Sequence, residues 1–248
     1  MSGGTYEPGS AEFQLGTLLS APLAEPWRSR GYLPHFDAPQ AIQAITFRLA
    51  DSLPREVLAR IDREIAAEPE TRKATERRKH VDALMDAGHG SCILAHPRAA
   101  KTVQDALLHF DGVRYQLLAW VVMPNHVHTL IEPLNPWGLA KIVQSWKSYT
   151  GRWIREHWQE LSVAKSAGLE LGAPRVWQRE YWDRFIRDER HYQATIEYIH
   201  NNPVKAGLVP RAEDWPWSSA KGYSESARAE LELSAPKTRI NGAPGRDG

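Results

Sequence analysis

Apolar side chains recur along the middle of the chain at two spacings, every second residue in some segments and every third or fourth residue in others. These are the periods of strands and of helices. Residues 41–49 (AIQAITFRL), for example, are rich in β-branched and aromatic side chains, which predicts a strand. The predicted elements are, in chain order, a strand at 41–49, helices at 54–67 and 99–110, strands at 115–122 and 126–131, a helix at 137–158, a strand at 181–186 and a helix at 189–201.

This order resembles a ferredoxin-like split βαβ arrangement, an α+β fold with an antiparallel sheet and helices packed on one face. The flanking segments differ, because Gly, Pro and Ser interrupt them without sustained periodicity. We therefore predict a flexible N-terminal arm at 1–40, one folded domain at 41–223 and a disordered C-terminal tail at 224–248.

The charges of the chain nearly balance, with 31 Lys plus Arg against 30 Asp plus Glu and a net charge of +1. The global basicity of many nucleic-acid binders is missing, so any site for a polyanion must be local. One basic segment, 71–80 (TRKATERRKH), has five Lys or Arg against one Glu. It is either the solvated face of a helix or a patch that contacts phosphates.

Nothing in the sequence indicates a membrane protein. The longest apolar run, Leu117–Met123, has seven residues, and a bilayer span needs about 20. The start (MSGGTYEPGS) lacks the basic and apolar segments of a secretory signal, and the single cysteine, Cys92, cannot form an internal disulfide. We expect a cytoplasmic protein without membrane contact.

The densest polar motif is NHVH at 125–128, inside the predicted strand 126–131. Side chains alternate along a strand, so His126 and His128 project to the same side. Two nitrogen ligands can then meet one divalent metal. Structural histidines are the alternative, but the apolar flanks predict a buried strand, where paired histidines without a ligand would be costly.

A second polar motif, EYIHNNPV at 197–204, ends the last predicted helix. Tyr198 and Asn202 are four residues apart and would share a helix face. Pro203 disfavours a helical conformation at the residue before it, so we expect Asn202 at or just past the helix end. A core tyrosine with an asparagine cap is the alternative reading of this motif.

Five segments in series, WVVMPNHVH, SWKSYT, VWQREYWDRFIRDERHY, YIHNNPVKAGLV and DWPWSSA, resemble the REP-associated tyrosine transposases. These are a branch of the single-tyrosine HUH transposases, and the resemblance extends over roughly residues 90–223. It implies that 41–223 is a catalytic domain that binds single-stranded hairpin DNA. It also implies either a homodimer or a monomer as the active form.

The resemblance further implies a role for each residue of the two polar motifs. His126 and His128 match the metal-binding HUH pair, Tyr198 matches the nucleophile, and Asn202 takes the place of a polar third ligand, for which related enzymes generally use glutamine. The cofactor would be Mg²⁺ or Mn²⁺, since a phenol with a pKa near 10 needs help from the phosphate side. The expected product is a 5′-phosphotyrosyl enzyme with a free 3′ hydroxyl.

Basic and amide side chains interleaved with aromatic rings favour contacts with unpaired DNA, because rings stack on bases and cations hold phosphates. The rings are Trp177, Tyr181 and Trp182. The alternative is that the arginines are simply solvated and that each tryptophan belongs to the core, which is the more common place for a single tryptophan. The predicted DNA-binding residues are Gln178, Arg179, Arg184, Arg187 and Lys205, with Lys147 and Arg152 from the long helix.

Three alternatives remain at this point. Tyr149 is a rival nucleophile, although it lacks a nearby amide to complete a metal site. A metal-dependent nucleotide hydrolase of the histidine-triad type would need a third alternating histidine, where this chain has Leu130. A non-catalytic protein that only binds hairpin DNA is the third. A covalent adduct between protein and DNA would distinguish the tyrosine enzyme from both other classes.

Overall fold

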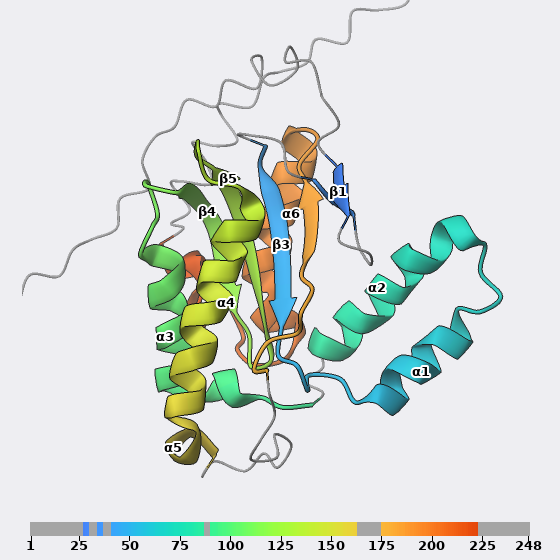
Figure 1. Ribbon diagram of the computed structural model, residues 1–248, viewed down its shortest axis with the longest axis horizontal. Helices are drawn as coiled ribbons and strands as arrows, with labels where there is room; N and C mark the ends of the chain where they lie inside the picture. The colour runs from blue at the N-terminus through green and yellow to red at the C-terminus, as the bar shows by residue number, and fades with distance from the viewer. Residues whose placement is uncertain (1–26, 30–33, 37–40, 87–89, 163–174, 223–248) are drawn as a thin grey trace, which may run out of the picture.

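The structure of the protein, a computed structural model, describes residues 27–29, 34–36, 41–86, 90–162 and 175–222 (Figure 1). Its elements are, in chain order, β1 (Trp27–Ser29), β2 (Pro34–Phe36), β3 (Gln43–Arg48), α1 (Arg55–Glu64), α2 (Glu70–Asp86), the short 3₁₀ helix η2 (Ile93–Ala95), α3 (Pro97–Leu108), β4 (Tyr115–Val122), β5 (His126–Pro133), α4 (Leu139–Glu156), α5 (Trp158–Ser162), β6 (Trp182–Phe185), α6 (Glu189–Lys205) and the 3₁₀ helices η3 (Ala212–Asp214) and η4 (Ser219–Gly222).

The main sheet has four strands in the order β4-β5-β3-β6, and every neighbouring pair is antiparallel. With β3 and β5 in the centre, this is the strand order of a split βαβ unit. The predicted α+β class and antiparallel sheet are therefore confirmed. Because β3 pairs with β5, Thr46 lies opposite His128 and Arg48 lies opposite His126.

Helices cover both faces of this sheet rather than the single face that was predicted. α3 and α4 pack on the face that carries Ile45, Phe47 and Val127. The other face carries Val121 and Leu130 and is covered by α6, which lies behind the sheet in Figure 1. Both faces of the central strands are apolar, so each needs a helix to exclude water.

The segment predicted as a flexible N-terminal arm contains some regular structure. β1 and β2 pair antiparallel, with Trp27 opposite Phe36, and β2 contacts β6. This part of 1–40 therefore forms a two-stranded sheet of its own that lies beside β6. The rest of 1–40 and the predicted tail at 224–248 lie outside the described residues.

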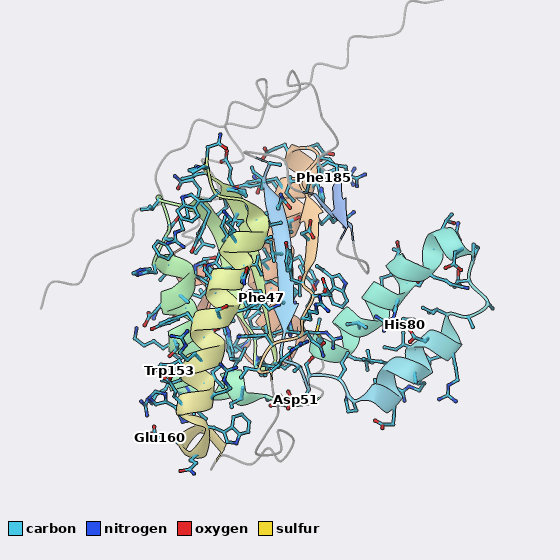
Figure 2. All side chains as sticks on the ribbon, viewed as in Figure 1. Phe47, Asp51, His80, Trp153, Glu160 and Phe185 are labelled. Atoms are coloured by element: carbon cyan, nitrogen blue, oxygen red, sulfur yellow. The ribbon has the colours of Figure 1, made fainter. Side chains whose placement is uncertain are left out.

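Several tryptophans belong to the core. Trp146 of α4 stacks on Phe47, which lies on β3 beneath that helix (Figure 2), and its Nε1 donates to the Tyr115 hydroxyl at 2.9 Å. Trp177 is only 5% exposed and packs edge-on against Phe47. Its Nε1 donates to Thr150 Oγ1 at 2.9 Å. Because its ring is enclosed by the protein, Trp177 is a core residue, the alternative that the sequence favoured for each tryptophan, and not a ring that stacks on bases.

α1 and α2 form a helical hairpin, residues 55–86, that projects from the sheet (Figure 1). It has a small core of its own, in which Ile61, Ile65, Val81 and Met85 are buried. Among the helices of the described residues, in this hairpin or elsewhere, none has the length and apolar character to cross a membrane.

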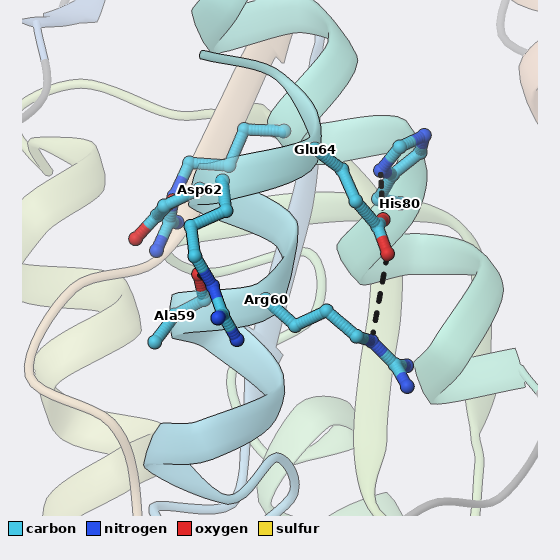
Figure 3. Close-up of polar contacts among 7 residues, drawn as sticks. Ala59, Arg60, Asp62, Glu64 and His80 are labelled. Atoms are coloured by element: carbon cyan, nitrogen blue, oxygen red, sulfur yellow. Dashed lines mark hydrogen bonds and ion pairs between the residues drawn. The ribbon is translucent and has the colours of Figure 1, made fainter.

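Carboxylates of the helical hairpin offset the basic segment 71–80. Lys73 Nζ lies 2.9 Å from Glu70 Oε2, Arg77 Nε lies 2.7 Å from Asp62 Oδ1, and Lys79 Nζ lies 2.7 Å from Glu76 Oε1. Glu64 interacts with both Arg60 and His80, as Figure 3 shows. This pattern favours the solvated helix face over the phosphate-contacting patch, since these cations already have partners.

Candidate active site

The site begins on β5, where alternation of side chains directs His126 and His128 to the face covered by α6. Both side chains are buried, with exposed fractions of 0% and 3%. Their Nε2 atoms lie 3.0 Å apart and the two rings are nearly perpendicular, at 78°. The structure thus brings together two imidazole nitrogens that face each other.

The outer nitrogen of each histidine has its own polar partner. His126 Nδ1 lies 2.6 Å from Asn125 Oδ1, and His128 Nδ1 lies 2.8 Å from Thr46 Oγ1. Such contacts fix the plane of each ring and leave Nε2 as the inward-facing atom. Burial, together with the nearby positive charge of Arg48, lowers the pKa of His126 to about 3, so this imidazole is neutral.

α6 delivers Tyr198 and Asn202 to the histidines from the other side. The rings of Tyr198 and His128 are 5.2 Å apart between centroids and meet edge to face at 71°. Asn202 is fully buried, and its Nδ2 lies 3.4 Å from His128 Nε2. Both polar motifs of the sequence therefore meet at one place.

The prediction that Asn202 lies at or past the helix end is wrong, because α6 continues to Lys205 with Pro203 inside its last turn. Pro203 cannot donate a backbone hydrogen bond. The next turn closes nonetheless, since the amide of Ala206 donates to the carbonyl of Asn202 at 3.0 Å. Tyr198 and Asn202 therefore both lie within the continuous helix α6 and share one of its faces.

The donor set suits a divalent transition ion better than a structural zinc. Within the described ranges no group of three or more His, Cys, Asp or Glu side chains could hold a metal. Two buried imidazoles nevertheless meet through their Nε2 atoms, and the buried amide group of Asn202 lies 3.4 Å from one of them. Nitrogen and carbonyl oxygen donors suit Mn²⁺, and an incomplete protein shell leaves positions for a substrate. These residues fit the metal that the HUH resemblance implies.

Two cations near the site belong to different elements. Arg48 is only 9% exposed, its Nη1 donates to Ser52 Oγ at 3.1 Å, and its guanidinium lies over the Trp182 ring. The sequence analysis missed Arg48, although an arginine inside an otherwise apolar strand was a signal. Lys205, predicted to contact DNA, lies with its Nζ 4.9 Å from the centre of the Tyr198 ring.

A basic cleft of about 620 Å³ lies between α4 and the segment 175–181. Its lining includes four of the predicted DNA-binding residues, Lys147, Arg152, Gln178 and Arg179, and adds Arg155 and Arg175, which the sequence analysis missed. Glu180 is the single acidic residue among those that line it. The cleft therefore concentrates positive charge on a chain of nearly neutral net charge.

The remaining candidates lie outside this cleft. Arg184 and Arg187 are exposed and near His191, whose pKa is lowered by burial and by both arginines. Tyr149, the rival nucleophile, is 58% exposed on α4, the helix that covers the opposite face from the histidines. Of these two tyrosines, only Tyr198 is in contact with the histidine pair.

Part of the chain is similar to known transposases. Residues 101–202 match the family model described as "Transposase IS200 like". A REP-associated tyrosine transposase of Escherichia coli is 31% identical over 105 residues, which are 42% of this chain and 54% of the relative. A protein of Haemophilus influenzae is 29% identical over 118 residues, 47% of this chain and 64% of the relative. The matches thus span less than two thirds of either relative.

Among solved structures, a REP-associated tyrosine transposase bound to a REP hairpin aligns over 79% of this chain and 84% of its own, with 19% identity and a TM-score of 0.48. The match to the family model covers the segment that holds His126, His128, Tyr198 and Asn202. Over residues 101–202 the chain is therefore similar to the IS200-like transposase family, and its sequence relatives include a REP-associated tyrosine transposase.

Proposed function

We propose that this protein cuts and rejoins single-stranded DNA at hairpin, REP-like elements through a 5′-phosphotyrosine intermediate. The observation that carries the proposal is the contact of the Tyr198 ring with His128, whose Nε2 lies 3.0 Å from Nε2 of His126. The Thr46 hydroxyl also contacts His128, but at the outer Nδ1, so Tyr198 is the candidate nucleophile beside the pair. A cytoplasmic location and the choice between monomer and homodimer stay predictions.

His126, His128 and Asn202 would hold Mg²⁺ or Mn²⁺, the histidines through Nε2 and Asn202 through its amide oxygen. When bound, the ion would orient a phosphate group and neutralise part of the charge that develops on it. The contact of Thr46 with His128 is compatible with metal binding through Nε2, because a threonine hydroxyl can either donate to His128 Nδ1 or accept from it. His128 can therefore carry its proton on Nδ1 and present a bare Nε2.

Tyr198 supplies the attacking oxygen. As its bond to phosphorus forms, the bond from phosphorus to the 3′ oxygen of the leaving strand breaks, and that oxygen takes up a proton to become a hydroxyl. The Lys205 ammonium beside the Tyr198 ring favours the negative charge that the phenol oxygen gains as it loses its proton. The phosphotyrosine keeps the bond energy, so a 3′ hydroxyl can later reverse the step.

The basic cleft would hold the DNA backbone, because five cations lie along it against one carboxylate. Reversing two of these charges, in Arg152→Glu with Arg155→Glu, should weaken binding of hairpin DNA. Each lost phosphate contact should also reduce the slope of log affinity against log salt by about 0.7. Fluorescence anisotropy over a salt series measures both. The matched double reversal Lys79→Glu with Lys101→Glu, outside the cleft, should change neither; equal effects of the two pairs would contradict this placement.

Lys147 should make DNA binding depend on pH. Burial lowers the pKa of Lys147 to about 8, although Glu180 opposes the shift, and Nζ donates to the Arg179 carbonyl at 2.8 Å. A phosphate bound beside Lys147 favours the charged amine and so raises this pKa. At a pH where Lys147 of the free protein is neutral, DNA binding therefore requires Lys147 to take up a proton. Affinity should therefore be constant well below the pKa and fall as pH rises through it, by up to about tenfold per pH unit. Lys147→Arg, which stays charged, should remove this dependence; an unchanged pH profile in that variant would assign the titration to another group.

A non-catalytic hairpin-binding protein is the second candidate, since the basic cleft could act without chemistry. The two are separated by incubating the protein with labelled single-stranded hairpin oligonucleotides and Mn²⁺ or Mg²⁺. The tyrosine enzyme gives a protein–DNA adduct that survives denaturant, whereas a binding protein shifts the DNA and leaves it uncut.

A further inference from the structure

Asn125 connects the helical hairpin α1–α2 to the histidine site. This residue immediately precedes β5 and is fully buried. Its Nδ2 donates to the carbonyl of Met85 in the last turn of α2, at 3.2 Å. Its Oδ1 lies 2.6 Å from His126 Nδ1. A continuous chain of contacts therefore runs from α2 to His126.

These two contacts determine the direction of each hydrogen bond. A backbone carbonyl can only accept, so the side that faces Met85 must be the NH₂ group of Asn125. The side that faces His126 is then the amide oxygen, which also can only accept. His126 must donate from Nδ1, and a neutral imidazole with its proton on Nδ1 has a lone pair on Nε2. The orientation of Asn125 thus selects the tautomer that can bind a metal.

The position of the Met85 carbonyl depends on how the helical hairpin packs. The Met85 side chain is 1% exposed and lies in the small core with Ile61 and Val81. The two ends of the segment that carries the hairpin, after β3 and before α3, also lie close together at Ser52 and Gly90. A Cβ on Gly90, which has a φ of +80°, would lie 2.2 Å from the Ser52 carbonyl oxygen. α2 further contacts α6, the helix of Tyr198 and Asn202. Although the hairpin projects from the sheet, the end of α2 therefore contacts the elements that form the site.

We propose that the α1–α2 helical hairpin supports the metal site, with Asn125 as the positioning residue that transmits its packing to His126. The inference rests on the proposed function for the identity of the bound group. It assigns a task to a segment that the family match at 101–202 does not include. Loosening the hairpin should then weaken metal binding, although no atom of α1 lies among the proposed ligands.

A double-mutant cycle tests this coupling in the full chain. Mn²⁺ affinity is measured by calorimetry for the wild type, Asn125→Ala, Ile61→Ala and the double variant. Loss of a partner that orients a ligating histidine typically weakens metal affinity about 10- to 100-fold, which we expect for Asn125→Ala. Ile61→Ala should weaken binding in the wild type and have no further effect once Asn125 is alanine. Ile154→Ala, a matched truncation in the core beneath α4, should leave Mn²⁺ affinity unchanged.

A second readout needs no metal. Nitrogen-15 chemical shifts of metal-free protein report which nitrogen of His126 carries the proton. We expect Nδ1–H in the wild type and Ile154→Ala, and a mixture of tautomers in Asn125→Ala. Additive effects of Ile61→Ala and Asn125→Ala, or an unchanged tautomer in Asn125→Ala, would overturn the inference. A wild type that shows the expected tautomer and binds no Mn²⁺ would instead contradict the proposed function while leaving the contact from Met85 to His126 intact.

Discussion

Tyr198→Phe should abolish formation of the covalent protein–DNA adduct while hairpin DNA still binds. The substitution removes one oxygen atom, the one that would be esterified, and keeps the ring that packs against His128. Without that oxygen no phosphotyrosine can form, so we expect adduct below detection rather than a partial decrease. Denaturing electrophoresis of a labelled hairpin oligonucleotide with Mn²⁺ measures the adduct, and anisotropy measures binding.

Tyr149→Phe is the matched control, because it removes the same atom from an exposed tyrosine on the other side of the sheet. It should retain full adduct formation. If Tyr198→Phe kept cutting DNA at the wild-type rate, the assignment of the nucleophile would be wrong. If Tyr149→Phe lost the adduct instead, the rival tyrosine would take its place.

His126→Ala should lose metal binding and, with it, DNA cleavage. The two histidines supply both nitrogen donors of the site, with Nε2 atoms 3.0 Å apart. Removing an orienting partner already weakens metal affinity by 10- to 100-fold in typical sites, so removing a ligand should weaken Mn²⁺ binding by at least about 100-fold. Calorimetry measures the affinity, and the adduct assay at saturating Mn²⁺ measures the chemistry.

His109→Ala provides the comparison, since His109 is an exposed residue that follows α3 and lies outside the site. Mn²⁺ affinity and adduct formation should both stay at the wild-type level in this variant. Retention of tight Mn²⁺ binding by His126→Ala would remove that histidine from the ligand set. Loss of binding in both variants would show that Mn²⁺ binds to surface histidines rather than to the paired site.

The features that depend on short stretches of chain were predictable. Alternation along β5 places His126 and His128 on one side whatever surrounds the strand, because the period of two is local. The spacing of Tyr198 and Asn202 on α6 is local in the same way. The wrong prediction for Asn202 also came from a local rule, that the residue before a proline avoids the helical conformation. In the structure Asn202 stays helical, and its carbonyl accepts a hydrogen bond from the amide of Ala206.

Contacts between distant segments could not be predicted from any single motif. Arg48 approaches His126 only because β3 and β5 pair in one particular register. The basic cleft combines α4 with the segment 175–181, and only the packing of Trp177 against Phe47 decides that this ring belongs to the core rather than stacking on bases. Likewise, nothing in the hydrophobic pattern of α6 indicated which face of the sheet it would cover.

By itself, then, the sequence determined the order of the four strands of the main sheet and of α1, α3, α4 and α6, and the placement of two histidines on one side of one strand. The tertiary structure decided that Tyr198 meets those histidines, that cations gather in a cleft beside α4, and that Asn125 links Met85 to His126. The physical reason is the distance along the chain over which each effect acts, because the periodicity of the backbone relates only residues that are a few positions apart. Hydrogen bonds and charges between distant segments exist only after strand register and helix packing have brought their atoms within about 3 to 6 Å.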